Sequence, residues 1–483
     1  MTDGQRPLTT AAKSTTSDGV PQRKLASRVA DRIISDIGRG GMQVGAVIGS
    51  EAELVERYQI SRAVFRESVR LLEHLGIAST RRGPGGGLVV AEPSTAAVTQ
   101  AFIVYLTYTG LSLDDLFEAR QLLECTTVRL AAERADENQI RALRDSVAAY
   151  RSGEVLDADA HHMLHTVIAH VARNPAGELF TDVLGRLTAR WTYPSQSIEE
   201  QHQALDAAAQ AHERIVEAIT VGDAGRAEWL MAAHLDALGD WLGRHRDSPK
   251  SLDWALDESN GDDKLGTQVA RKIIVGIVDR DWPVGEVLGS ETELIERFDV
   301  SRSALREAVR LIEYHEVATM KSGPGGGLVV SAPGIGPIVR AATVYLRHSG
   351  IVSSDLLVLR HDLESKALAL AADRATPDDI ERLRAAATAD VDAGFRSPLN
   401  EELHVNVADL AGNTALSLFI RVLVELTRVH ANIPGWRSVR RSEINDETER
   451  AHNAIVDAVE QGDVALAQRR LGKHLAAMEP LLG

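Results

Sequence analysis

The chain has 483 residues, a formal net charge of −16 and a single cysteine. This length exceeds one ordinary domain of roughly 100–200 residues, so we expect three or four domains, and one cysteine excludes an internal disulfide and favours a reducing cytoplasm. No apolar run reaches the roughly 18 residues of a membrane span, and the acidic total by itself argues against a nucleic-acid partner. Residues 1–22 lack the apolar core of a signal peptide and are predicted to form a disordered tail.

A long internal repeat sets the architecture. Segments 45–90 and 285–330 are identical at 26 of 46 positions, which indicates a duplicated module. In each copy an amphipathic helix precedes a Ser-x-x-Glu capping box, at Ser50 and Ser290, that opens a short helix. A brief turn, a second helix and two β-type stretches around GPGGG follow. This order predicts a winged helix-turn-helix, in which the glycines supply the positive φ angles of a hairpin tip.

The second helix of each repeat is the candidate DNA reader. Arginines share one face and apolar residues another, as major-groove docking requires, and arginine can bind guanine bidentately. Serines at the helix start can bond a phosphate, and wing arginines can reach the minor groove or the backbone. The alternative, a solvated face paired with Glu67 and Glu73, is disfavoured by the turn, the wing and the repetition. The candidate contacts are Ser61, Arg62, Arg66, Arg70, Arg81, Arg82, Ser301, Arg302, Arg306 and Arg310.

The two repeated modules differ in charge. Residues 24–90 contain ten Lys or Arg against seven Asp or Glu, whereas residues 264–330 contain nine against ten. Only the first module is therefore locally basic on an otherwise acidic chain. We expect the first head to be the stronger DNA reader.

Histidines recur at matched spacing in the helical segments after each head. His212 and His234 lie 22 residues apart around a turn, so an antiparallel helix pair places them at equal height. Imidazoles that converge in a helical bundle suit a divalent transition metal such as Zn, Ni or Mn; ordinary half-buried histidines are the alternative, which the repetition of the triad disfavours. Unmatched histidines, namely His162, His170, His202 and His245, are expected at the surface. The candidate ligands are His161, His165, His212, His234, Asn400, His404, His452 and His474.

The heads resemble those of the GntR superfamily of bacterial transcription regulators, FadR subgroup. The stretch SEAELVERYQISRAVFRESVRLLEHLGIAS and the glycine-rich wing carry the resemblance, and both are repeated. The chain departs from the family at Ala52 and Thr292, where a DNA-contacting arginine is common, and at Ser322, which stands where the first wing has Arg82. The resemblance implies DNA contacts at Arg62, Arg66, Arg82, Gly83, Arg302, Arg306 and Gly323.

The helical segments are similar to the FCD domain that accompanies such heads. In that family an Asp-x3-His pair and two later histidines bind a metal, which holds a small carboxylate effector. His161 and Asn400 replace the family aspartate, so the resemblance implies a stronger first metal site. It also implies that Arg120 and Arg360 reach the effector's carboxylate. Salt bridges to the glutamates four residues later are an equally open alternative.

We therefore expect a mainly α-helical, ligand-responsive transcription regulator, a repressor, that binds an operator, a metal and a small carboxylate. A metal-dependent helical enzyme tethered to DNA is the rival, but no base or nucleophile is evident near the histidines. A DNA binder with inactive effector pockets is a third reading. The chain is expected in the bacterial cytoplasm, at the nucleoid, as an intramolecular pseudo-dimer or a homodimer. The expected divisions are tail 1–22, head 23–93, helical domain 94–246, connector 247–262, head 263–333 and helical domain 334–483.

Overall fold

The structure, a computed structural model, covers ten stretches of the chain. The predicted tail, the predicted connector and Asn400 lie outside them. The chain divides into two compact units, of which the first is residues 1–73 with 77–91 and the second contains all other residues. The described stretches are 25–39, 42–83, 85–92, 95–151, 158–189, 198–244, 265–323, 325–388, 401–430 and 441–482.

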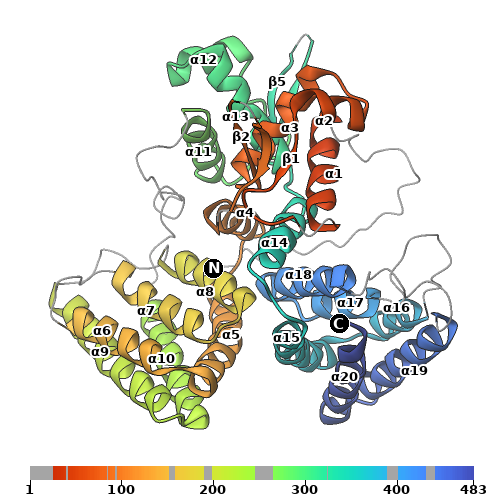
Figure 1. Ribbon diagram of the computed structural model, residues 1–483. Helices are drawn as coiled ribbons and strands as arrows, with labels where there is room; N and C mark the ends of the chain where they lie inside the picture. The colour runs from red at the N-terminus through yellow and green to blue at the C-terminus, as the bar shows by residue number, and fades with distance from the viewer. Residues whose placement is uncertain are drawn as a thin grey trace. The chain divides into compact units, whose positions relative to one another are not determined.

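The first unit is a winged helix-turn-helix head (Figure 1). The predicted capping box is present, because the Ser50 side chain accepts from the backbone of Glu53 while the Glu53 carboxylate accepts from the backbone of Ser50. The short helix then ends at Gln59, whose φ of 54° turns the chain into the next helix. The helices are α1 Leu25–Arg39, α2 Glu51–Tyr58 and α3 Arg62–His74.

A three-stranded antiparallel sheet forms the wing of this head. Strand β3 lies between β1 and β2, and its register with β2 runs from Ala78 opposite Val90 to Arg81 opposite Gly87. The hairpin tip has positive φ at Gly83 (100°), as the glycine-rich tip predicted. The sequence predicted only a hairpin, whereas the sheet has a further strand, β1, which is three residues long. The strands are β1 Val47–Gly49, β2 Ala78–Arg81 and β3 Gly87–Val90.

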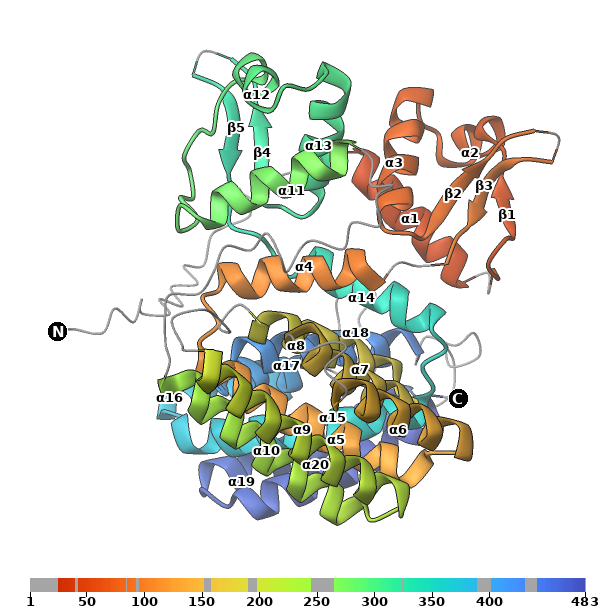
Figure 2. The same ribbon diagram turned by 90° about the vertical axis from the view of Figure 1, so that its left-hand side faces the viewer.

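The second head repeats this fold with a smaller sheet (Figure 2). Its two strands pair as in the first wing, but the equivalent of the first head's edge strand is reduced to one bridge between Val287 and Val329. Leu305 and Ile312 of the second helix-turn-helix helix are fully buried against the rest of the head. The elements are α11 Leu265–Val278, α12 Glu291–Phe298, α13 Arg302–Tyr314, β4 Ala318–Lys321 and β5 Gly327–Val330.

The first helical bundle is built around α5. This helix packs against α7, α8, α9 and α10 and is buried along most of its circumference, so its sequence shows little amphipathic periodicity. Helices α9 and α10 form the antiparallel pair that the histidine spacing predicted. The elements are α4 Thr95–Tyr108, α5 Leu113–Arg134, α6 Glu137–Arg151, α7 Ala158–Val171, α8 Pro175–Ala189, α9 Ile198–Thr220 and α10 Ala224–Arg244.

The second helical bundle repeats the first around α15, which packs against α17, α18, α19 and α20. A mainly α-helical chain with two winged heads and two helical bundles is therefore confirmed. The elements are α14 Gly336–His348, α15 Ser353–Arg374, α16 Pro377–Ala387, α17 Glu402–Leu410, α18 Thr414–His430, α19 Arg441–Glu460, α20 Val464–Met478 and the 3-10 helix η2 Glu479–Leu481.

Within the second unit, the two bundles contact each other through equivalent residues. The Asn174 side chain donates to the Asp355 carbonyl at 3.0 Å, and the Asn413 side chain donates to the Asp115 carbonyl at 2.9 Å. Each residue of one bond has its repeat counterpart in the other, which is the reciprocity of an isologous interface. The phenyl rings that stack between the bundles, with centroids 4.1 Å apart and planes at 10°, also belong to counterparts, Phe180 and Phe419.

Candidate DNA-reading helices and histidine clusters

Five of the six predicted arginines of α3 and α13 are exposed to solvent. Arg62, Arg66 and Arg70 are exposed, while Phe65 and Val69 on the opposite face are buried. In the second head Arg302 and Arg306 are exposed and Arg310 is half-buried. Each helix thus has an apolar back fixed in the head core and a cationic front, which is the geometry that groove docking needs.

One arginine of each recognition helix lies close to a glutamate of the preceding helix. Arg66 lies 3.4 Å from Glu51, and Arg306 lies 2.9 Å from Glu291, which is the equivalent residue of the preceding helix. All four side chains are exposed to solvent by a third or more. Exposed pairs of this kind contribute only about 0–1 kcal/mol, so they do not prevent the arginines from turning to phosphates or bases.

The helix-start serines and the wing arginines have local roles of their own. The Ser61 hydroxyl accepts from the backbone of Val64 at 3.3 Å, and the Ser301 hydroxyl caps α13. Arg81 donates to the Gly85 carbonyl at 3.1 Å and braces the wing tip, whereas the neighbouring Arg82 is exposed. Gly83 and Gly323 both have open space at the Cβ position, and both adopt φ angles near 100°.

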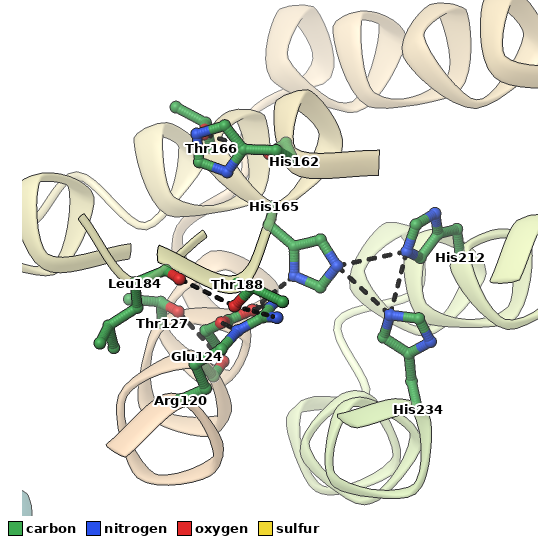
Figure 3. Close-up of polar contacts among 10 residues, drawn as sticks. All are labelled: Arg120, Glu124, Thr127, His162, His165, Thr166, Leu184, Thr188, His212 and His234. Atoms are coloured by element: carbon green, nitrogen blue, oxygen red, sulfur yellow. Dashed lines mark hydrogen bonds and ion pairs between the residues drawn. The ribbon is translucent and has the colours of Figure 1, made fainter. Parts of the chain in front are cut away.

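Three histidines meet in the first helical bundle (Figure 3). His165 comes from α7, His212 from α9 and His234 from α10. Their Nε2 atoms form a nearly equilateral triangle: 3.3 Å from His165 to each of the other two, and 3.2 Å between His212 and His234. All three side chains are buried. The helix hairpin of α9 and α10 thus brings His212 and His234 together, and His165 of α7 completes the cluster.

A buried ion pair orients one histidine of this cluster. The Nδ1 atom of His165 lies 2.5 Å from Glu124, and the same carboxylate accepts from Arg120 Nε at 2.6 Å. A ring that donates Nδ1–H to a carboxylate presents its Nε2 lone pair to the other side, here towards the cluster (Figure 3). Burial acts to raise the pKa of Glu124, but Arg120 and His165 outweigh it and hold that pKa well below its usual range.

The buried imidazoles are held in the neutral form. Burial lowers the pKa of His212 and His234 well below the ordinary histidine value, and the neighbouring imidazoles and Arg120 lower it further. Burial also lowers the pKa of His165, against the opposing effect of Glu124. Neutral imidazole is the form that ligates a metal.

The second bundle contains the equivalent cluster of His404, His452 and His474. The Nε2 atoms of His452 and His474 lie 3.1 Å apart, and Glu364 lies 2.5 Å from His404 Nδ1. Burial acts to raise the pKa of Glu364, but Arg360 and His404 lower it to about 2. Burial, aided by His404 and Arg360, lowers the pKa of His452 to about 2.

Both clusters fit a divalent transition metal. Three nitrogens that each lie about 2.1 Å from one ion at tetrahedral or octahedral angles are about 3.0–3.4 Å apart, and the first triangle has edges of 3.2–3.3 Å. In the second cluster, the buried Nδ1 of His452 and the buried Nε2 of His404 have no hydrogen-bond partner among the described residues. Three buried imidazole nitrogens that face one point present lone pairs that a bound cation would satisfy.

The fourth predicted ligand of each site is not placed. His161 lies in α7, but its side chain falls outside the described residues, and Asn400 falls outside them entirely. The expectation that His162 lies at the surface is wrong. Its ring is only 17% exposed and its Nε2 lies 3.0 Å from Asp182, because α8 packs over this face of α7. His170 is 71% exposed, as expected.

Three side chains around the buried arginines were not predicted from the sequence. Thr188 accepts from Arg120 Nη1 at 3.0 Å, and its counterpart Thr427 accepts from Arg360 at 2.8 Å. The identity of these threonines in both copies was the available signal. Glu401 contacts Arg360 in the second bundle, and no repeat signal could find it because the first bundle has His162 there.

Arg120 and Arg360 do form the i, i+4 ion pairs that were one alternative, and both are fully buried. The ion pair and an effector contact are compatible, since each glutamate occupies chiefly the Nε side of its guanidinium.

In the parts of the chain that the structure describes, no helix is long and apolar enough to cross a membrane.

Two family models each match the chain twice. The model of the bacterial regulatory proteins of the gntR family matches residues 25–88 and 265–329, and the FCD domain model matches residues 115–237 and 355–477. The chain belongs to the GntR family. It carries the GntR head and the FCD domain in tandem duplicate, so the resemblance seen in its sequence is confirmed.

Similar curated proteins each match part of the chain. The uncharacterized HTH-type transcriptional regulator YcbG of Bacillus subtilis is 28% identical over 226 residues, which is 46% of this chain and 92% of that protein. The HTH-type transcriptional repressor NanR of Escherichia coli K12 is 30% identical over 237 residues, 44% of this chain and 82% of the repressor. Among solved structures, Streptococcus agalactiae GntR is 24% identical and covers 45% of this chain and 100% of its own, with a TM-score of 0.31. This GntR-family chain is therefore a transcription regulator with FCD effector-binding domains, and the two curated relatives described above are named transcription regulators.

Proposed function

We propose that this regulator represses transcription by binding an operator through α3 and α13, and that a small carboxylate held at a metal in the FCD domains releases it. The observation that carries the metal proposal is the triangle of Nε2 atoms from three helices, backed by an Arg–Glu pair and repeated in the second bundle. A divalent ion would be held by His165, His212 and His234, and by His404, His452 and His474. When bound, it would supply a cationic centre for an acid's oxygen atoms.

The proposed DNA contacts are supported by arginines that are exposed on helices whose opposite faces are buried. Ser61, Arg62, Arg66, Arg70, Arg82 and their counterparts would divide between phosphate contacts and base contacts. The first head carries an additional cation at its wing, and so is proposed as the stronger reader. The relative NanR, which is named a repressor, favours repression as the sign of regulation.

One chain is proposed to act as a pseudo-dimer. The reciprocal bonds of Asn174 and Asn413 join the two FCD domains as two subunits of a symmetric dimer would be joined. Two heads then serve two half-sites of one operator. We propose the domain division 23–93, 94–246, 263–333 and 334–483, and a cytoplasmic location at the nucleoid.

The proposal is tested by metal analysis and operator release. The full chain, purified without chelator, is expected to contain two transition-metal ions per chain, as measured by inductively coupled plasma mass spectrometry. A footprint on the DNA upstream of its own gene supplies the operator, and a panel of acetate, lactate, malate and citrate is then screened for release. A metal-free chain that still releases DNA with the same acid would contradict the metal's role, and no release by any acid would contradict the carboxylate's.

A further inference from the structure

We propose that Glu401 is a built-in carboxylate ligand of Arg360, so that the second FCD domain is already occupied at its arginine and only the first accepts a carboxylate from solution. The inference rests on the proposed carboxylate effector and states which of the two domains senses it. It makes Glu401 the residue that sets the specificity of the second domain.

The contacts of Glu401 are those of a bound acid. Its two carboxylate oxygens lie 3.3 Å from Nη1 and 3.1 Å from Nη2 of Arg360. Both oxygens therefore accept hydrogen bonds from the outer edge of the guanidinium. The Arg360 side chain is 0% exposed and that of Glu401 is 9% exposed. A bidentate carboxylate on this edge is the arrangement with which arginine recognises acids.

The first domain has a different residue at this position. Glu401 precedes the cluster residue His404 by three positions, and His162 precedes His165 by three. His162 does not approach the arginine and instead contacts Asp182 on α8. Arg120 is as deeply buried as Arg360, yet among the described residues Glu124 is the one carboxylate that contacts it.

The charges at the two arginines follow from this exchange. In the first domain Arg120 and Glu124 balance, so an incoming carboxylate meets a neutral pair beside the histidine cluster. In the second domain Arg360 faces two glutamates, and the group carries one excess negative charge before any ligand arrives. An acid from solution would have to displace Glu401 from Arg360. It would also be repelled by the carboxylates of Glu364 and Glu401, because like charges in a buried site are weakly screened.

Exchange of the two residues tests the inference in the full chain. The proteins are zinc-loaded and titrated by calorimetry with whichever of acetate, lactate, malate and citrate gives the largest thermal shift. We expect one acid per chain for the unmodified protein, two for Glu401→His and none for His162→Glu. The double exchange returns the number to one, now at the second domain. Zinc content of two per chain verifies that each variant retains both histidine clusters.

Glu401→Ala is the second variant, in case histidine does not fit beside Arg360. It leaves the guanidinium edge open, so acetate is expected to raise its melting temperature more than it raises that of the unmodified chain. Two acids per unmodified chain would overturn the inference and leave the proposed effector intact. So would one acid per chain for Glu401→His together with no greater stabilisation of Glu401→Ala by acetate than of the unmodified chain. No acid bound by the unmodified chain or by any variant would overturn both.

Discussion

At the scale of single residues, the decisive groups are buried charges that serve another side chain. Glu124 holds Arg120 and His165 at once, and Glu364 does the same in the second domain. Such partners fix the tautomer and orientation of a metal-binding imidazole. Their buried positions also make them costly to replace, since removal leaves an arginine without its partner.

Glu124→Gln is expected to weaken zinc binding at the first cluster by about 10–100-fold, because the amide can accept from His165 but no longer carries the charge that polarises the ring. Competition with a chromophoric zinc chelator measures the affinity of each site. Glu364→Gln is the matched variant and should weaken only the second site. Equal affinity in Glu124→Gln and the unmodified chain would contradict the role given to this carboxylate.

Each histidine cluster should lose its ion when one of its three histidines is removed. His212→Ala is expected to reduce the zinc content from two ions to one per chain, and His212→Ala with His452→Ala to none, because two remaining imidazoles bind zinc poorly. Elemental analysis after dialysis counts the ions. The exposed His170→Ala serves as the control and should retain both; loss of zinc there would mean that the clusters are not the sites.

At the scale of elements, the two wings differ where the two recognition helices agree. The helices keep arginines at the same three positions, whereas the first wing has Arg82 and the second has Ser322. A wing cation near the DNA phosphate backbone contributes salt-dependent affinity without base specificity. Substitutions in the wing and in the recognition helix should therefore change DNA binding in different ways.

Arg82→Ser should reduce the slope of log affinity against log salt by about one, and weaken specific and non-specific DNA alike. Arg62→Ala should instead cost about 1–3 kcal/mol on the operator and relax its specificity. Fluorescence anisotropy at several salt concentrations separates the two. Ser322→Arg, the reciprocal wing exchange, is expected to gain slope. An unchanged slope in both wing variants would show that the wings do not approach the DNA.

At the scale of the whole molecule, the duplication places inside one chain an interface of the kind that joins two subunits. The stacked Phe180 and Phe419 are fully buried between the bundles. Phe419→Ala should lower the free energy of unfolding by about 3–5 kcal/mol, measured by urea denaturation. Trp229, which is 68% exposed, gives the control: Trp229→Ala should change it by less than about 0.5 kcal/mol.

A pseudo-dimer also predicts the particle size. The chain should sediment as a single copy of 52.3 kDa, because the reciprocal interface is already satisfied within it. Analytical ultracentrifugation at micromolar concentration measures this mass. A stable particle of twice the mass would mean that a further surface joins two chains and that four heads are presented.

The capping boxes, the glycine tip and the paired histidine spacing were readable in the sequence because each depends on residues close along the chain, and the repeat was readable because its two copies can be compared position by position. Local spacing fixes helix faces, and a helix hairpin fixes the relative height of His212 and His234. The same reasoning failed for His162, because exposure depends on which helix packs over a face. It missed β1, which is too short to show an alternating pattern.

By itself, the sequence determined a duplicated winged head followed by a helical effector domain, and it singled out the histidines and arginines of the candidate sites. Only the tertiary structure decided how those side chains are partnered: that Glu124 serves both Arg120 and His165, and that Glu401 closes on Arg360 while His162 turns to Asp182. The physical reason is that a buried charged or polar side chain needs a specific partner, and apart from the Arg120–Glu124 pair these partners lie 20 to 41 residues apart along the chain.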